Sequence, residues 1–144
     1  MPYTTASANA LLKLILQAVS IPGIADNATA SPSASLYVSL HAAAPGAGAN
    51  QATNEVAYPG YARVAVARGP AGWTVAGNVA NLVAAMEFVE VSGAGVSTAT
   101  HLGIGTAAAG NGILLSYGAL DPVIPIQAGV APRLKTTTKV TFEV

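Results

Sequence analysis

The segment from Leu36 to Arg68 constrains the fold of this chain most strongly, because two alternating stretches flank a long loop. In residues 36–41 large apolar side chains occupy every second position, and valines do so in residues 63–68. Alternation with a period of two predicts strands with one buried face. The loop between them, residues 42–60, spans roughly 20 residues, longer than the usual limit of about 12–15 for an unstructured connection. We therefore expect this loop to reach outward to a partner.

Further alternating stretches follow, separated by Gly and Pro turn signals about 8–12 residues apart. Pro125 limits the stretch around it to an edge or irregular strand, and Asp121-Pro122 is expected to turn the chain before it. This pattern favours an all-β fold, an antiparallel jelly-roll-like sandwich of eight to ten strands. Strands are predicted within residues 72–84 (with a turn at Gly77-Asn78), 85–91, 98–106, 113–120 and 133–144, the last with a face switch near 137–139.

The N-terminal segment, residues 5–20, has the spacing of an amphipathic helix. Ser7 is a plausible N-cap, and Pro22-Gly23 is expected to stop the helix. The helix either packs on the sheet of its own domain or docks on a partner. The predicted organisation is a helix or arm over residues 1–23 and a β-sandwich over residues 24–144. The apolar face of the helix consists of Leu11, Leu12, Ile15, Leu16 and Val19.

Charged residues are scarce in this chain. They make up 8% of the sequence, and six basic residues balance six acidic ones, whereas ordinary domains have about 25%. A free monomer with so little charge tends to associate, so the composition favours a component of a larger assembly over a small Ala-rich domain. Neutrality argues against nucleic acid as a partner, and the apolar run at residues 11–24 is too short for a bilayer span.

Residues suited to catalysis or metal binding are few. His41 and His101 are the only histidines and cysteine is absent. If their strands are neighbours, the two histidines can face one region, and Glu55 or Glu87 can join them in a weak metal site. We expect instead polar histidines on the outward side of their strands, bonded to loop backbone. No catalytic residues, no cofactor and no metal are predicted.

Two other side chain types have alternative interpretations. Trp73 is the only Trp; a core aromatic is favoured over a platform for sugar stacking. Arg63 and Arg68 fall on opposite faces of one strand by parity, so at most one of them enters the core. A buried arginine there requires a carboxylate such as Glu55 or Asp121.

Gly103 and Gly105 lie on the same strand face and indicate a close backbone approach.

The string SLHAAAPGAGANQATNEVAYPGYARVAVAR, followed by GWTVAGNVA and ATHLGIGTAAAGNG, resembles a family of small virion proteins of tailed phages. The resemblance covers roughly residues 35–118. Where the pattern SLHTADPG has Thr and Asp, this chain has Ala42 and Ala44, so any contact made by that Asp is missing. Members are labelled tail-fibre proteins, and similar small β-rich proteins serve as capsid cement or decoration proteins.

The resemblance and the composition together imply a structural virion protein. The favoured expectation is a capsid cement protein, made in the host bacterial cytoplasm, that stabilises the outer capsid surface by binding the major capsid protein as a dimer or trimer. The alternative is a tail-fibre or receptor-binding module, in which Trp73, Tyr58, Tyr61 and Tyr117 gather on an exposed face and contact a host glycan or surface protein. Partner contacts are expected at Leu11, Leu12, Ile15, His41, Pro45, Asn54, Glu55, Tyr58 and Tyr61.

Overall fold

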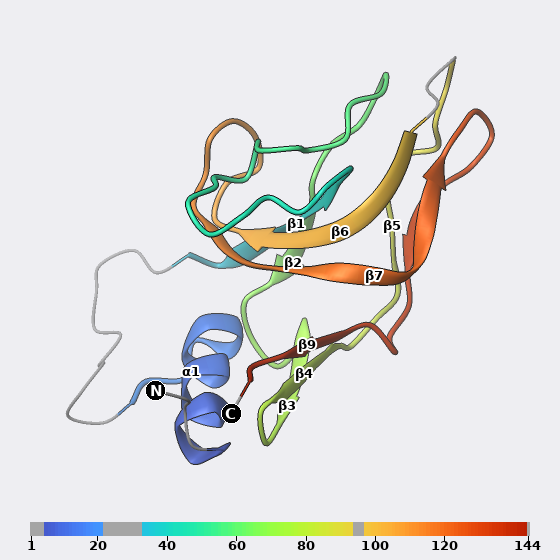
Figure 1. The fold of residues 1–144 in the computed structure, drawn as a ribbon. Coiled ribbons are helices and arrows are strands. Elements are labelled where there is room, and N and C mark those ends of the chain that lie inside the picture. Colours follow the sequence, from blue (N-terminus) through green and yellow to red (C-terminus); the bar gives the residue numbers. More distant parts are fainter. Residues whose placement is uncertain (1–4, 22–32, 94–96, 144) are drawn as a thin grey trace. The chain divides into compact units, whose positions relative to one another are not determined.

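The computed structural model describes residues 5–21, 33–93 and 97–143 of the 144 residues. The fold is all-β with antiparallel sheets and one N-terminal helix, as predicted (Figure 1). The jelly-roll connection stays a prediction. The chain divides into two compact units: the first contains helix α1 with strands β3, β4 and β9, and the second contains β5 to β8 and most of β1 and β2.

Helix α1 spans Thr5–Gln17 and ends earlier than the predicted residue 20. Ala18 adopts a left-handed conformation with φ of 57°, and the Val19 amide donates to the Lys13 carbonyl oxygen at 3.1 Å. A left-handed residue just after the last turn is a common way to end a helix without proline, and the hydrogen bond from Val19 back to Lys13 closes this end. Ser7 lies inside the helix rather than at its N-cap. The predicted stop at residues 22–23 lies outside the described residues.

In the first unit, helix α1 contacts strands β3 and β4, so the first of the two predicted packing modes is present. The sheet order is β3 (Trp73–Ala76), β4 (Val79–Leu82) and β9 (Lys139–Thr141), and the predicted turn contains Gly77 with φ of 61°. Leu12 and Leu16 of the helix are buried, and Trp73 is 2% exposed, which confirms it as a core aromatic.

Arg68 fastens the end of helix α1. Its Nε donates to the Ile15 carbonyl oxygen at 2.7 Å, and Nη2 donates to the Leu14 carbonyl oxygen at 2.6 Å. The last carbonyls of a helix lack hydrogen-bond donors within the helix and carry partial negative charge. A guanidinium at this position supplies the donors and a compensating positive charge. Arg68, just after β2, therefore stabilises the C-terminal end of the helix. Arg63, just before β2, belongs to the second unit.

The second unit contains a four-stranded sheet in the order β2 (Val64–Ala67), β1 (Ser35–His41), β6 (Ser97–Gly105), β7 (Leu114–Ile126). Figure 1 shows β7, in orange, along one edge beside β6. A separate pair joins β5 (Met86–Glu87) to β8 (Arg133–Leu134). In the register of β1 with β6, His41 lies directly opposite His101, so the two histidine-bearing strands are neighbours.

Three predicted strands differ from the observed ones. The stretch 85–91 is reduced to the two residues of β5. Strand β7 continues past Asp121-Pro122 to Ile126, although its register with β6 is broken between Ala119 and Ile124. It is an edge strand, as Pro125 requires. The final stretch is split into β8 and β9 by a turn in which the Thr138 amide donates to the Lys135 carbonyl oxygen, close to the predicted face switch.

Candidate functional site

The 42–60 loop folds back onto the sheet of the second unit, which corrects the expectation that all of it reaches outward. The Ala42 amide donates to the Asn54 carbonyl oxygen at 2.8 Å, and the Val56 amide donates to the Leu40 carbonyl oxygen at 2.9 Å. A second attachment joins Asn50 to Ile113 by an isolated β-bridge. Backbone hydrogen bonds therefore hold both halves of the loop in place.

Gln51 anchors the middle of the loop with a completely buried side chain. Its Nε2 donates to the Tyr37 carbonyl oxygen at 3.3 Å, and its Oε1 accepts from the Ala107 amide at 2.9 Å. The Gln51 amide also donates to the Gly112 carbonyl oxygen at 2.9 Å. A buried side-chain amide is tolerated because both of its ends have partners.

Three glycines make room for these buried polar groups. A Cβ at Gly105 or Gly112 would overlap the Gln51 side chain, and a Cβ at Gly103 would lie 2.8 Å from the Ser39 Oγ. None of the three adopts a positive φ, so space rather than backbone conformation requires glycine here. The predicted close approach at Gly103 and Gly105 is confirmed: side chains of β1 and β7 approach Gly103, and Gln51 of the loop approaches Gly105.

His41 is fully buried, which corrects its predicted position on an outward face. Its Nδ1 lies 2.9 Å from the Thr53 carbonyl oxygen, which can only accept, so Nδ1 carries the proton. In the neutral ring Nε2 then accepts from the Ser39 hydroxyl at 2.9 Å. The predicted bond from histidine to loop backbone is thus present, but in the interior. Burial lowers the pKa of His41, and the bond to Thr53 opposes this shift.

The Ser39 and His41 pair has the separation of a nucleophile and its base, with the Thr53 carbonyl as the orienting group. Both side chains are 0% exposed. Strand β6 passes so closely at Gly103 that even a methyl group would not fit. The pair therefore fastens the loop to the sheet and offers no access to a substrate in this conformation.

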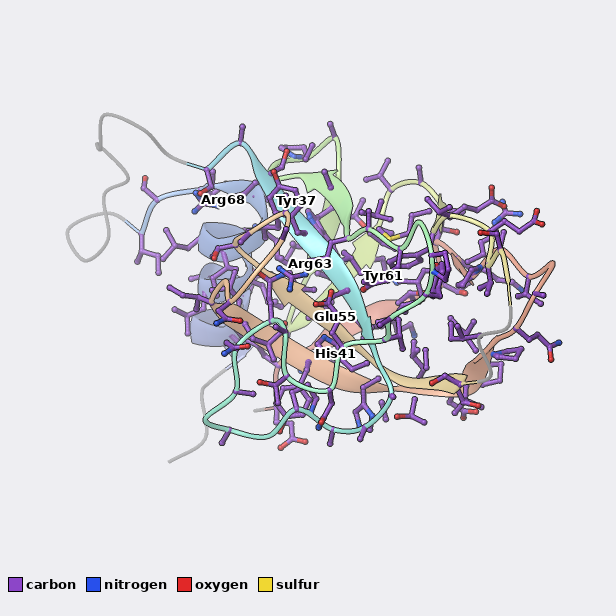
Figure 2. The ribbon with its side chains drawn as sticks, turned by 90° about the horizontal axis from the view of Figure 1, so that it is seen from above. Tyr37, His41, Glu55, Tyr61, Arg63 and Arg68 are labelled. Atoms are coloured by element: carbon purple, nitrogen blue, oxygen red, sulfur yellow. The ribbon has the colours of Figure 1, made fainter. Side chains whose placement is uncertain are left out.

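Glu55 and Arg63 form a buried ion pair beside the histidine (Figure 2). Arg63 Nε and Nη2 donate to the two carboxylate oxygens of Glu55, both at 2.7 Å. Arg63 also donates to the carbonyl oxygens of Ala107 at 3.0 Å and Gly110 at 2.8 Å, which secures the loop between β6 and β7. The carboxylate partner expected for a buried arginine is confirmed as Glu55.

Tyr61 completes this cluster. Its hydroxyl donates to Glu55 Oε1 at 2.9 Å and accepts from the Leu40 amide at 3.0 Å. Burial is the main cause that raises the pKa of Tyr61, and the hydrogen bond to Glu55 raises the pKa of Arg63. Both shifts keep the groups in the state that the bonds require, a neutral phenol and a charged guanidinium.

The residues predicted to contact a partner separate into buried and accessible groups. Leu12, His41 and Tyr58 are buried, so their side chains cannot reach a partner in this fold. Glu55 and Tyr61 are committed to the ion-pair cluster. Accessible positions are Asn54, which is exposed, and Pro45, which is half-buried. Leu11 and Ile15 line a pocket of about 460 Å³ together with Thr141, Phe142 and Glu143.

The predicted aromatic face is not assembled. Tyr58 and Tyr61 pack edge to face at 5.2 Å, and Tyr61 stacks on Phe88 at 6.1 Å, within the interior. Trp73 is in the core of the first unit. Only Tyr117 is exposed, at 42%, with its ring 6.4 Å from that of His101.

Sequence reasoning missed Ser39 and Gln51. Neither has a motif around it, although the glycines of β6 indicated that something approaches closely. Across the described ranges, no three His, Asp or Glu side chains are grouped as metal ligands would be. In the same ranges, no helix has the length and apolar character needed to cross a bilayer.

Substitution Gly105→Ala is expected to destabilise the protein, because the new methyl group displaces Gln51 and leaves its buried partners unpaired. The expected cost is about 2–4 kcal/mol in the free energy of unfolding, measured by urea denaturation. Gly118→Ala is the matched control in the neighbouring strand, where the added methyl meets nothing within 4 Å. Equal effects of the two substitutions would contradict this account of the glycine.

Substitution Glu55→Gln is expected to cost about 3–5 kcal/mol, because it leaves the Arg63 charge buried without a counterion. The matched control is Glu87→Gln, whose partner Arg133 is 3.7 Å away and whose side chain is 61% exposed. Removal of that exposed pair should cost about 0.5 kcal/mol or less. Urea denaturation of both variants measures the difference, and similar losses would show that the buried pair has no special role.

The buried His41 predicts acid sensitivity. Its pKa in the folded protein lies below the ordinary value of 6.5, so the unfolded chain binds the proton more readily. This contribution to stability is fully present above about pH 6.5 and is lost as the pH falls toward the folded-state pKa. His41→Asn retains a donor for the Thr53 carbonyl and should weaken the pH dependence. The measurement is the free energy of unfolding of the wild-type protein and of His41→Asn from pH 7 to pH 5. Equal pH dependence in the two proteins would refute the role of His41.

No curated protein matches the chain significantly. A family model does match, described as Podophage GP4 fiber I protein gp80, and the match extends over residues 2–141. It confirms the resemblance to virion proteins at the level of a phage structural family. The chain belongs to the Podophage GP4 fiber I protein gp80 family, and it is a phage structural protein.

Proposed function

We propose that this chain is a structural subunit of a phage fibre, and that it acts by contact with neighbouring protein chains. The observation that carries the proposal is the family match over residues 2–141, because the family description names a fibre protein. The site agrees with a structural role, since its polar groups bond to one another in the interior rather than to a ligand.

The fastened 42–60 loop supports a role in contact. Its outward positions include Ala42–Ala44 and Asn54, and none of these is charged. Burial of Gln51 and the Glu55–Arg63 pair fixes the loop before any partner arrives. A surface that is already ordered loses little conformational entropy on binding, and uncharged surface is inexpensive to desolvate. The loop therefore suits a permanent contact between subunits.

The alternative is a capsid cement protein that binds the major capsid protein on the outer capsid surface. The observation in its favour is the charged fraction of 8%, which suits a protein enclosed by neighbours. A subunit inside a fibre is also enclosed by neighbouring chains, so the low charged fraction supports both locations equally. The family description adds weight to the fibre.

Receptor binding through an aromatic platform does not form part of the proposal. Of the aromatic side chains considered for it, Trp73 and Tyr58 are buried and Tyr61 is bonded to Glu55. Tyr117 alone provides an exposed ring. The fibre role proposed here is therefore one of assembly.

Quantitative mass spectrometry of purified virions, combined with immunogold labelling, tests the location. A fibre subunit is expected in far fewer copies than the major capsid protein, with label confined to the tail or fibres. The major capsid protein and a known tail protein, measured in the same digest, calibrate the two extremes. A copy number in fixed ratio to the major capsid protein, with label over the head, would refute the fibre and support the cement role.

A further inference from the structure

The connection between β6 and β7, residues 106–113, contains the one Asn-Gly sequence of the chain, Asn111-Gly112. Asparagine is a chemically labile residue. Glycine has no side chain, so it leaves its own backbone amide open to attack a neighbouring group. Asn111 is exposed to solvent. Figure 1 shows this connection, in orange, beside the 42–60 loop, in teal to green, and the Gln51 amide joins the two by donating to the Gly112 carbonyl oxygen.

The Asn111 side chain is free, whereas the other asparagines that the structure describes are held. Each of those five has its side-chain amide in at least one hydrogen bond: Asn9, Asn50, Asn54, Asn78 and Asn81. The Asn111 side chain makes no hydrogen bond to any described residue. Asparagine side chains readily bond to nearby backbone, so a free one can turn toward the amide that follows it.

The peptide group between Asn111 and Gly112 is also unbonded. Within the described ranges, neither the Asn111 carbonyl oxygen nor the Gly112 amide has a partner. By contrast, the amide that follows Asn54 belongs to Glu55 and donates to the Ala52 carbonyl oxygen at 3.4 Å. Attack on the side chain requires this peptide group to rotate and its amide to lose a proton. A hydrogen bond opposes both events, and at Gly112 none does.

We propose that Asn111-Gly112 is a site of spontaneous covalent modification, and that the isoaspartate formed there releases the 42–60 loop from the β6–β7 connection. Solvent hydroxide removes the Gly112 amide proton, and the nitrogen attacks the Asn111 Cγ to form an N–Cγ bond. The Cγ–Nδ2 bond breaks, ammonia leaves, and a five-membered succinimide remains. Water then adds to one of its two carbonyl carbons, and the ring opens to aspartate or isoaspartate. One water is consumed for each ammonia released, and nothing is oxidised.

Isoaspartate changes the backbone at a point that is fixed on both sides. In this product the chain runs through Cβ and Cγ of residue 111, which adds one carbon atom to its path, about 1.5 Å. On one side the Gly110 carbonyl oxygen accepts from Arg63 Nη2 at 2.8 Å, and on the other the Gly112 carbonyl oxygen accepts from the Gln51 amide at 2.9 Å. Such bonds tolerate a range of only about 0.5 Å, so the longer chain cannot keep both.

The bond to Gln51 is the one expected to break. Arg63 is also fixed by Glu55 and by the Ala107 carbonyl oxygen, and its bond to Gly110 is charge-assisted. A charge-assisted bond is about twice as strong as a neutral one, and the bond from Gln51 to Gly112 is neutral. Gln51 is buried in the middle of the 42–60 loop, so loss of its partner loosens the loop there.

The same packing explains why the reactive pair contains glycine. A Cβ at Gly112 would overlap the Gln51 side chain, so the anchored loop requires glycine directly after Asn111. A bulkier residue at this position, which would hinder the attack, is excluded by the fold. Substitution of Asn111 is the change that removes the reactivity and keeps the anchor.

This inference does not depend on where the protein lies in the virion. A fibre subunit and a cement subunit would be modified in the same way. A head location would leave the modification site intact, and an unreactive Asn111 would leave the fibre proposal intact.

Incubation of the full chain in mildly alkaline heavy-oxygen water, followed by peptide mapping with mass spectrometry, is the first test. Heavy oxygen is expected to enter at Asn111 about tenfold or more faster than at Asn54. Asn54 is the matched internal control, because it is equally exposed but its Nδ2 donates to the Ala44 carbonyl oxygen at 3.0 Å. The ratio of the two rates should be larger in the folded protein than in urea, where those hydrogen bonds are lost.

Hydrogen exchange of the aged protein is the second test. The fraction that carries isoaspartate is expected to lose protection at the Gln51 amide, measured in the peptides of the 42–60 loop. Two variants are controls. Asn111→Gln closes a six-membered ring much more slowly, so it should keep its protection during the same incubation. Asn111→Asp carries the new charge without the longer backbone, and it should also keep its protection.

Three results would overturn the proposal. The first is incorporation at Asn111 no faster than at Asn54 in the folded protein. The second is a rate ratio that is no larger in the folded protein than in urea, which would assign the reactivity to the dipeptide alone. The third is an isoaspartate-containing fraction whose Gln51 amide is as protected as that of Asn111→Gln.

Discussion

The second unit depends on one steric constraint, the close approach of polar side chains from β1 and from the 42–60 loop to glycines on and just after strand β6. Glycine at positions 103, 105 and 112 leaves space for the polar side chains of Ser39, His41 and Gln51, which a methyl group would exclude. Once buried, each of these side chains needs a partner, and loop and strand backbone provide it. A long connection that would otherwise be mobile is thereby ordered by burial of polar groups in pairs.

The Glu55–Arg63 pair extends the same principle to charge. A guanidinium with side-chain exposure of 3% is tolerable because two carboxylate oxygens and two carbonyls accept from it. In a chain with so few charges, the use of one acidic and one basic residue in the interior leaves the surface still more neutral. The few charged residues are thus partly used inside the protein, which leaves a surface with little charge. Such a surface favours a subunit that functions among other subunits.

Strand β7 shows the converse situation. Its apolar sequence would be well satisfied in the middle of a sheet, but the chain places it at an edge, with one face half-buried and the other exposed along residues 114–121. Local sequence and tertiary position therefore disagree in an isolated copy. The loop and strand β7 differ in this respect: the polar groups of the loop are paired within the chain, whereas the side chains at 114–125 of β7 stay half-buried or exposed.

Local pattern was sufficient for much of the fold. Alternation predicted β1, β2, the β3–β4 hairpin and β6, and parity predicted that at most one of Arg63 and Arg68 is buried, with a carboxylate such as Glu55 beside it. These features depend on neighbours in sequence or on a rule about strand faces, so the sequence by itself determined them. The tertiary structure decided the direction of the loop, the burial of His41 and Gln51, the early end of α1 and the continuation of β7 past Asp121-Pro122. Each of these depends on which distant segment fills a space or leaves it open, and the physical reason is steric fit between residues far apart in sequence, which no local period encodes.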